Sequence, residues 1–426
     1  MKHVIRKQLI SLQLDAEQDA FRVQQKARDY FKDHIAPALE KVLDELSAPD
    51  EMISLDKLEI DLGDLTWRNG QLVADSHQIY RALKQSFSKV LSASSAQKEN
   101  PANFSVTSIE KHACHQWLYY MENGVLPWSL QQTHAAWLDQ VLHQLAIDPA
   151  LFERTKELIR HHHWFVSRLV HDHTDIFLQQ LAVVISAKPQ PGLIALIDKT
   201  SRGNSALHSP LLSKQKIWEE ALQQFSAGKT MYEPGETKPP ASAEIHPSEN
   251  PEKVLGLLQD GIFCYFAGVV LLHPFFRHLF HHLSLLENGL FIDDTARQKA
   301  VMLISYAATG NTITQDHELV VAKALCGMPL VQVPDEAGRH LSETDIQETQ
   351  NMIKAAIDQW PLMKNTSIDG LRESFLHREG KLIRDENSMV FKMEAAGIDV
   401  LLDHLPWNLS IIKFPWLDQL IRVEWR

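Results

Sequence analysis

The last 22 residues of the chain carry an unusual density of aromatic and proline residues. Within them lie three tryptophans and two prolines: Trp407, Trp416, Trp425, Pro406 and Pro415. Disordered segments are poor in bulky apolar side chains, because a chain that carries enough of them buries them. The C-terminus is therefore expected to be packed into the fold, with the prolines at strand starts or edges.

The overall composition is that of an ordinary globular protein. The 426 residues are 44% hydrophobic and 23% charged, and the chain is long enough for two or three domains. A formal net charge of −12 disfavours nucleic acid as a partner, since phosphate binding needs clustered Lys and Arg. The longest apolar run, residues 262–276, is shorter than the roughly 20 residues that span a bilayer, so no membrane span is expected.

Two features indicate a reducing, cytoplasmic environment. The N-terminus leads into no long apolar core, which disfavours a secretory signal. The three cysteines, Cys114, Cys264 and Cys326, are far apart and match neither a disulfide framework nor a zinc site. Buried free thiols are the expected state of these residues.

Helical periodicity dominates the chain, because apolar residues recur every three or four positions through most of it. In the first half it predicts helices over residues 15–46 with an interruption at Pro37, and over 75–92, 109–121, 129–146 and 149–187. In the second half it predicts helices over residues 251–286, 295–309, 317–326, 342–360, 367–378 and 398–405. Ser342 to Asp345 matches a capping box, and Gly310 and Gly327 are placed to end helices.

Strand periodicity is confined to the two ends. Alternating apolar residues predict strands over residues 8–14 and 53–62, a hairpin over 381–393, and last strands over 410–414 and 420–425. The fold class predicted is mainly α, multi-helix, with small β elements near the N- and C-termini. The N- and C-terminal strands are interpreted as sharing one sheet, since unpaired edges need cover.

Composition shifts divide the chain into four regions. The expected parts are a strand–helix–strand unit plus helix (residues 1–95), a helical middle region (105–187), a flexible linker (188–250) and a C-terminal helical domain with terminal β-hairpins (251–426). The linker is rich in Pro, Gly, Ser and Lys, and a short helical patch over residues 214–225 interrupts it.

Catalytic motifs are not found in the sequence: a phosphate-binding Gly-rich loop, a nucleophile elbow and a zinc-protease helix are all missing. Histidine is abundant, with 22 residues, and clusters occur at 161–163 and 171–173. His278 and His282 share a helix face at the spacing of metal ligands, but two ligands do not make a site. Packed or solvent-facing histidines are the alternative, and no catalytic, cofactor-binding or metal-binding residue is assigned.

Tryptophan supplies the candidate interface residues. The aromatic stretch from Trp117 to Trp137 is either a ligand platform or a helix–helix core. The candidates for a partner interface are Trp128, Trp407, Trp416 and Trp425. For the last three, packing into a core is the competing interpretation.

Several short stretches, in the same order along the chain, carry a family resemblance. N-terminal to the linker they are residues 5–8 (IRKQ), 14–15 (LD), 43–47 (LDELS), 57–63 (KLEIDLG), 117–118 (WL) and 124–128 (GVLPW). C-terminal to it they are 267–275 (AGVVLLHPF), 308–310 (ATG), 318–319 (EL), 323–327 (KALCG), 360–367 (WPLMKNTS), 370–382 (GLRESFLHREGKL) and 405–425. With these blocks, which span about two thirds of its length, the chain resembles the tape measure proteins of contractile injection systems.

The resemblance implies a non-enzymatic assembly role in a phage-tail-like particle, with no cofactor. Proteins of this family occupy the growing inner tube, bind hub or baseplate components and set tube length. The implied partners are inner-tube, hub and terminator proteins, and the implied place is the cytoplasm during assembly and the tube of the finished particle. The alternatives are a plug, scaffold or chaperone-like adaptor of the same machine, or a helical ligand-binding domain or enzyme.

Overall fold

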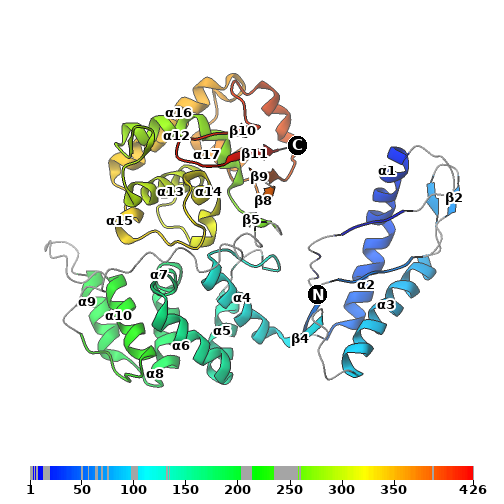
Figure 1. Cartoon of the computed structure of the whole chain (residues 1–426), viewed down its shortest axis with the longest axis horizontal. Coiled ribbons are helices and arrows are strands. Elements are labelled where there is room, and N and C mark those ends of the chain that lie inside the picture. Colours follow the sequence, from blue (N-terminus) through cyan, green and yellow to red (C-terminus); the bar gives the residue numbers. More distant parts are fainter. Residues whose placement is uncertain are drawn as a thin grey trace. The chain divides into compact units, whose positions relative to one another are not determined.

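A computed structural model describes residues 3, 5, 8–12, 20–48, 51–55, 57–62, 66–68, 71–73, 76–96, 104–130, 133, 135–202, 214–234, 258, 261–385 and 388–425. The chain divides into two compact units, residues 1–113 and 114–426, which are described separately. The described elements are mostly helices with small sheets, which confirms the predicted fold class (Figure 1). Among the described helices, none is long and apolar enough to cross a bilayer.

The first unit is built on three long helical segments and short strand pairs. The segments are α1 (Ala20–Tyr30), which continues through a π-helical turn (Phe31–Ile35) into α2 (Ala36–Leu46), and α3 (Ser76–Ala96). Strand β1 (Glu51–Leu55) pairs antiparallel with β4 (Phe104–Ser108), and β2 (Thr66–Arg68) with β3 (Gln71–Val73). The buried core lies between α2 and α3, where Val42 contacts a set that includes Ile79 and Leu83.

The interruption predicted at Pro37 takes the form of the π-helical turn that precedes it. Proline has no N–H to donate, and its ring collides with the carbonyl of the residue four positions earlier, here Asp33. Widening the turn over Phe31–Ile35 lets the chain continue into α2 without that bond.

The N-terminal strand predictions are largely wrong. Residues 8–12 form no strand and are exposed, and positions 13 and 14 lie outside the described residues. Of the second predicted strand, residues 53–55 belong to β1, whereas residues 57–62 are not in a strand. Leu58, Ile60 and Leu62 pack on the helical core instead. The alternation of these three residues indicates that they face one apolar surface. That surface is formed by helices and not by a sheet.

The described helices that follow are α4 (Ile109–Asn123), α5 (Ala135–Ile147), α6 (Pro149–His161), α7 (His163–Asp172), α8 (Asp175–Ser186), α9 (Pro191–Arg202) and α10 (Lys214–Ser226). Asp148 and Thr174 cap α6 and α8 through their side-chain oxygens. Helix α10 matches the helical patch predicted inside the linker, and it buries Trp218 and Phe225. Those residues of the expected linker are therefore packed, while the four-region division stays a prediction.

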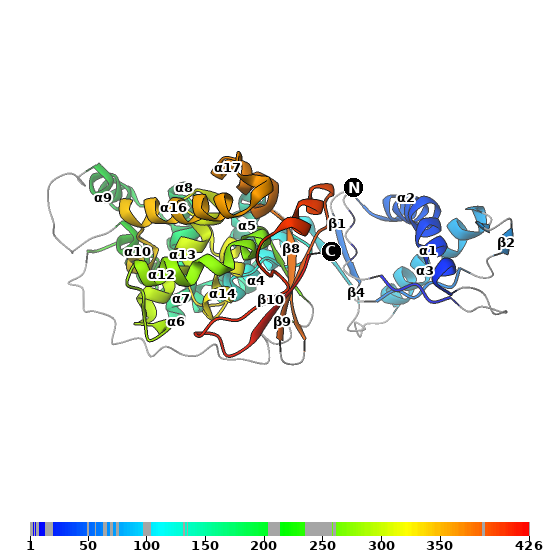
Figure 2. The ribbon, with the colours of Figure 1, turned by 90° about the horizontal axis from the view of Figure 1, so that it is seen from above.

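A five-stranded sheet organises the C-terminal part (Figure 2). Its strands are β5 (Ile262–Cys264), β8 (Gly380–Asp385), β9 (Ser388–Met393), β10 (Ile411–Ile412) and β11 (Leu420–Glu424). They lie in the order β10-β11-β9-β8-β5, with β9 and β11 parallel and the other pairs antiparallel. The predicted hairpin and the two last strands are confirmed. The proposed sharing with N-terminal strands is wrong, because β1 pairs with β4 in a sheet of its own and residues 8–12 form no strand.

The single helix predicted over residues 251–286 is also wrong, because strand β5 forms within this range. After β5 the chain forms a 3₁₀ segment (Ala267–Leu272) and α12 (His273–His282), followed by the short hairpin of β6 (Leu286–Glu287) and β7 (Leu290–Phe291). Every residue of the 3₁₀ segment is buried. A continuous apolar run of this length fits a buried strand or a buried helix equally well, so periodicity could not separate them.

The remaining helical elements follow the predicted ranges to within two residues, except the short helix over residues 336–339, which the sequence did not predict. They are α13 (Asp294–Thr309), a 3₁₀ turn η3 (Asp316–Leu319), α14 (Val320–Cys326), α15 (Glu336–Arg339), α16 (Glu343–Gln359), α17 (Ile368–Leu371), a π-helical turn η5 (Arg372–Leu376) and a 3₁₀ segment η6 (Gly397–His404). Gly310 and Gly327 end α13 and α14 in the left-handed conformation. Ser342 and Asp345 form the predicted capping box of α16.

Gly268 provides a test of this packing. A Cβ atom at this position would lie 1.8 Å from the backbone oxygen of Phe375, so Gly268→Ala forces the 3₁₀ segment away from η5. We expect it to lower the free energy of unfolding by at least about 2 kcal/mol in chemical denaturation, as overpacking of a core does. Gly397→Ala is the control, because nothing lies within 4 Å of its added Cβ. Equal stability of the two variants would contradict the close approach.

Candidate functional site

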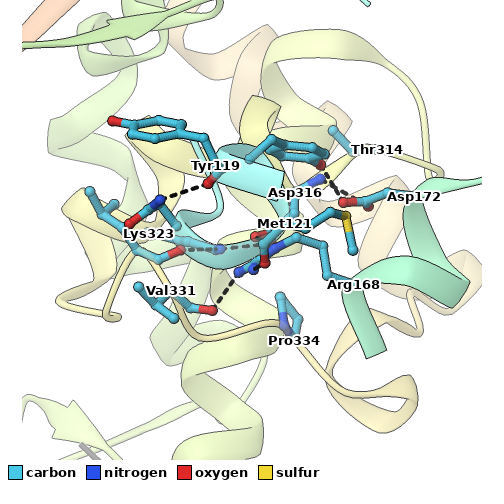
Figure 3. Close-up of polar contacts among 12 residues, drawn as sticks. Tyr119, Met121, Arg168, Asp172, Thr314, Asp316, Lys323, Val331 and Pro334 are labelled. Atoms are coloured by element: carbon cyan, nitrogen blue, oxygen red, sulfur yellow. Dashed lines mark hydrogen bonds and ion pairs between the residues drawn. The ribbon is translucent and has the colours of Figure 1, made fainter. Parts of the chain in front are cut away.

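Four charged side chains lie together in the interior of the second unit: Arg168, Asp172, Asp316 and Lys323. None is more than 7% exposed. Helix α7 supplies Arg168 and Asp172, η3 supplies Asp316 and α14 supplies Lys323 (Figure 3). Buried charges are rare unless they are paired, so the partners of this charge cluster decide what it does.

Arg168 uses its guanidinium to join three segments. Its Nε donates to Asp316 Oδ2 at 3.0 Å, and one terminal nitrogen donates to the Val331 carbonyl at 2.6 Å. The other terminal nitrogen donates to the carbonyl of Met121. A planar group with fixed donors holds these three acceptors in one geometry, which an ammonium could not do.

Asp316 and Lys323 form the second pair of the charge cluster. Lys323 Nζ donates to Asp316 Oδ1 at 2.7 Å and to the Leu330 carbonyl at 2.9 Å. Burial opposes ionisation of Asp316, but the charges of Lys323 and Arg168 outweigh it and hold its pKa below the ordinary value. Burial lowers the pKa of Lys323 to about 8, although the Asp316 carboxylate works against that shift.

Asp172 joins the charge cluster through hydrogen bonds to its carboxylate and to its backbone carbonyl. It accepts a hydrogen bond from the Tyr120 hydroxyl and another, at 3.0 Å, from the backbone N–H of Asp316. Its own backbone carbonyl accepts from Gln315 Nε2 at 3.0 Å. Burial, and then the neighbouring Asp316 charge, raise the pKa of Asp172 to about 6.

Gly124 explains how the backbone approaches the charge cluster so closely. It has a φ of +72°, and an added Cβ would lie 2.6 Å from the Leu330 oxygen, 2.8 Å from the Arg168 guanidinium and 2.9 Å from the Asp316 carboxylate. A side chain is therefore excluded here by backbone conformation and by space. Gly124 belongs to the GVLPW stretch that the sequence analysis singled out.

With two cations and two carboxylates, the charge cluster is balanced when all four groups are ionised. Buried pairs of this kind add little net stability over apolar packing, but removing one partner leaves an uncompensated charge. The arrangement therefore specifies how α4 and α7 meet the segment from η3 to residue 331. No motif in the sequence predicts this arrangement. The available signal was a lone charge inside an apolar run: Arg168 within residues 165–170 and Lys323 within residues 319–326.

A second set of polar contacts caps the C-terminus of α13. Arg372 Nε and one terminal nitrogen donate to the carbonyls of Ala307 and Tyr306, each at 3.1 Å. The His377 ring contacts the Ala308 carbonyl at 3.1 Å. A cation at a helix C-terminus satisfies free carbonyls and complements the helix dipole. Two stretches of the family resemblance, ATG and GLRESFLHREGKL, thus meet in space.

The aromatic C-terminus is packed, as its composition predicts. Trp407 Nε1 donates to the Leu271 carbonyl and Trp416 Nε1 to the Leu325 carbonyl, both at 3.0 Å. Trp425 is 5% exposed, and the Arg378 guanidinium lies 5.9 Å from its ring centroid. Trp425 therefore belongs to the hydrophobic core of the C-terminal region, and the partly buried Trp407 and Trp416 pack against that core. Whether they also contact a partner stays a prediction.

Trp128 differs from the other candidates, because 44% of its side chain is exposed. It follows the buried Val125 and Leu126 on the loop after α4. Trp117 and Trp137, the ends of the aromatic stretch, are both buried, which agrees with the helix–helix core interpretation. His278 and His282 are exposed on α12, and the described residues contain no group of three or more potential metal ligands.

The comparison with protein families decides the identity. A family model described as contractile injection system tape measure protein matches residues 2–237 and 187–425. The chain belongs to this family. No curated protein and no solved structure is detectably similar to it. The charge cluster and the capped helix α13 therefore lie within the matched part of a tape measure protein.

The buried histidines determine how the stability of this tape measure protein changes in acid. Burial lowers the pKa of His173 to about 4, of His317 to about 4 and of His171 to about 3. These rings take up protons near pH 6.5 only when the chain unfolds, so stability is present above that pH and is lost as the pH falls toward 4. The raised pKa values of Asp172, Glu219 and Glu318 act in the opposite direction. A fourth ring, His273, whose pKa burial lowers to about 4, adds to the loss of stability.

We expect the free energy of unfolding to fall by at least about 2 kcal/mol between pH 7 and pH 4.5. Urea denaturation at a series of pH values measures it. A free energy that is flat or rises across this window would show that the rings are not buried in neutral form.

Proposed function

We propose that this tape measure protein acts as a folded, non-enzymatic assembly protein, in which contacts to other parts of the machine matter more than the length of its own chain. Its partners in this proposal are inner-tube, hub or baseplate, and terminator proteins, which it meets in the cytoplasm during assembly. The plug, scaffold and adaptor roles are forms of the same proposal.

The observation that carries the proposal is the shortness of the helices. Among the described elements α3 is the longest helix, with 21 residues. At 1.5 Å per residue it extends about 32 Å, whereas the whole chain as one helix would extend about 640 Å. Caps close the ends of several helices, and buried side chains fold the chain back into two compact units. A chain packed in this way is poorly suited to measure distance by its contour.

Deletion and duplication of residues 235–250 test the proposal. The segment follows α10 and the residues up to 234 that pack beside it, and it lies outside the described residues. Its 16 residues would extend about 50 Å if fully stretched. We expect particles of unchanged tube length from both variants, measured by electron microscopy. Tubes that shorten with the deletion and lengthen with the duplication would establish a ruler and overturn the proposal.

Trp128 is the partner contact that we propose among the four candidates. Tryptophan is enriched among residues that dominate binding energy at interfaces, and a half-exposed indole is available without unfolding. The buried Val125 and Leu126 anchor the loop that presents it. Trp407, Trp416 and Trp425 are in this proposal mainly core residues.

Alanine substitution separates the two roles. Trp128→Ala should reduce co-purification with tube or hub proteins at least about tenfold, equivalent to about 1.4 kcal/mol, with an unchanged melting temperature. Trp425→Ala, the control, should lower the melting temperature because it empties a core position. Normal partner binding by Trp128→Ala would remove this residue from the interface.

A further inference from the structure

Within the compact second unit, the hydrophobic core of the C-terminal residues includes almost nothing from the helices that precede it. We call residues 114–226 the helical half and residues 261–425 the C-terminal half. The hydrophobic core of the C-terminal half includes Ile304, Phe375 and Phe391, and the buried side chains of α5 to α10 are not part of it. Among the described residues, Val125 is the one buried hydrophobic side chain of the helical half in that core, and Tyr119 packs against its edge.

The contacts that fix how the two halves are oriented against each other are polar. Arg168 reaches from the helical half to Asp316 and to the Val331 carbonyl. In the other direction, Gln315 and the backbone of Asp316 both donate to Asp172. The charge cluster is thus the junction itself and not a feature of either core. The Tyr120 ring, edge-on to His317 at 5.3 Å, completes this junction.

We propose that the charge cluster is a conformational lock, and that the helical and C-terminal halves part as preformed bodies when it is broken. A buried charge that loses its partner is stabilised by reaching water, and parting the halves exposes it. The two hydrophobic cores gain nothing from opening, so each stays folded. This inference goes beyond the proposed function, because it gives the chain a closed and an open form of different reach.

Two chemically unrelated substitutions break the lock in the full-length protein. Asp316→Asn removes the carboxylate that binds Arg168 and Lys323. Gly124→Ala leaves every charge in place but pushes a methyl group against the Arg168 guanidinium, the Asp316 carboxylate and the Leu330 carbonyl. Their controls are Asp198→Asn, an exposed carboxylate on α9, and Gly192→Ala, whose added Cβ has nothing within 4 Å.

Hydrogen exchange of the full-length protein, read by mass spectrometry, distinguishes opening from unfolding. Both lock variants should exchange at least tenfold faster in residues 121–126 and 314–332. Exchange in α8 and α13, one helix from each core, should stay within twofold of the unchanged protein, and the controls should match it throughout. Small-angle X-ray scattering should show a larger radius of gyration for the lock variants alone.

Three results would overturn the inference. The first is loss of protection in α8 and α13 together with the junction, which would make the unit a single cooperative body. The second is protection at the junction that does not change in either variant. The third is failure of both variants to fold, which would place the charge cluster in the folding core rather than at a separable junction.

Discussion

The salt bridge between Arg168 and Asp316 is the interaction on which the arrangement of the second unit depends. The two side chains are 148 residues apart and fully buried, and their atoms lie 3.0 Å apart. Lys323 and Asp172 then balance the charge, and Gly124 provides the space that lets a loop reach them. A hydrophobic contact tolerates sliding, whereas a desolvated charge is stable only opposite its partner. The cluster therefore fixes how α4 and α7 meet the segment from η3 to residue 331.

Four of the stretches that carry the family resemblance, GVLPW, AGVVLLHPF, ATG and GLRESFLHREGKL, have a shared physical role. They bring backbone close to backbone or cap free carbonyls. Gly268 lies against the Phe375 backbone, so a side chain cannot be accommodated there. Arg372 and His377 bind the last carbonyls of α13, and an added Cβ at Gly310 would lie 2.8 Å from the Arg372 guanidinium. In these four stretches the family likeness thus coincides with contacts at which size and hydrogen bonding leave little freedom.

The aromatic C-terminus packs on the hydrophobic core of the C-terminal region. Trp407 and Trp416 each use the indole N–H to bind a carbonyl of a distant segment, at Leu271 and Leu325, while their rings pack on the core. Indole suits this task because it combines a large apolar area with one donor. A tape measure protein with such an end is packed at its C-terminus, and in our proposal it is the exposed Trp128, rather than these tryptophans, that contacts another protein.

The sequence by itself determined the elements with local causes: α13 with its glycine cap, the capping box at Ser342, the hairpin of β8 and β9, and the burial of Trp425. Caps, turns and periodicity act within a few residues and can be seen in a single stretch of chain. Only the tertiary structure decided that β5 joins the C-terminal sheet, that residues 57–62 pack on helices, and that Arg168 meets Asp316. Pairing of strands and of buried charges depends on residues distant in sequence, and a local pattern does not contain that information.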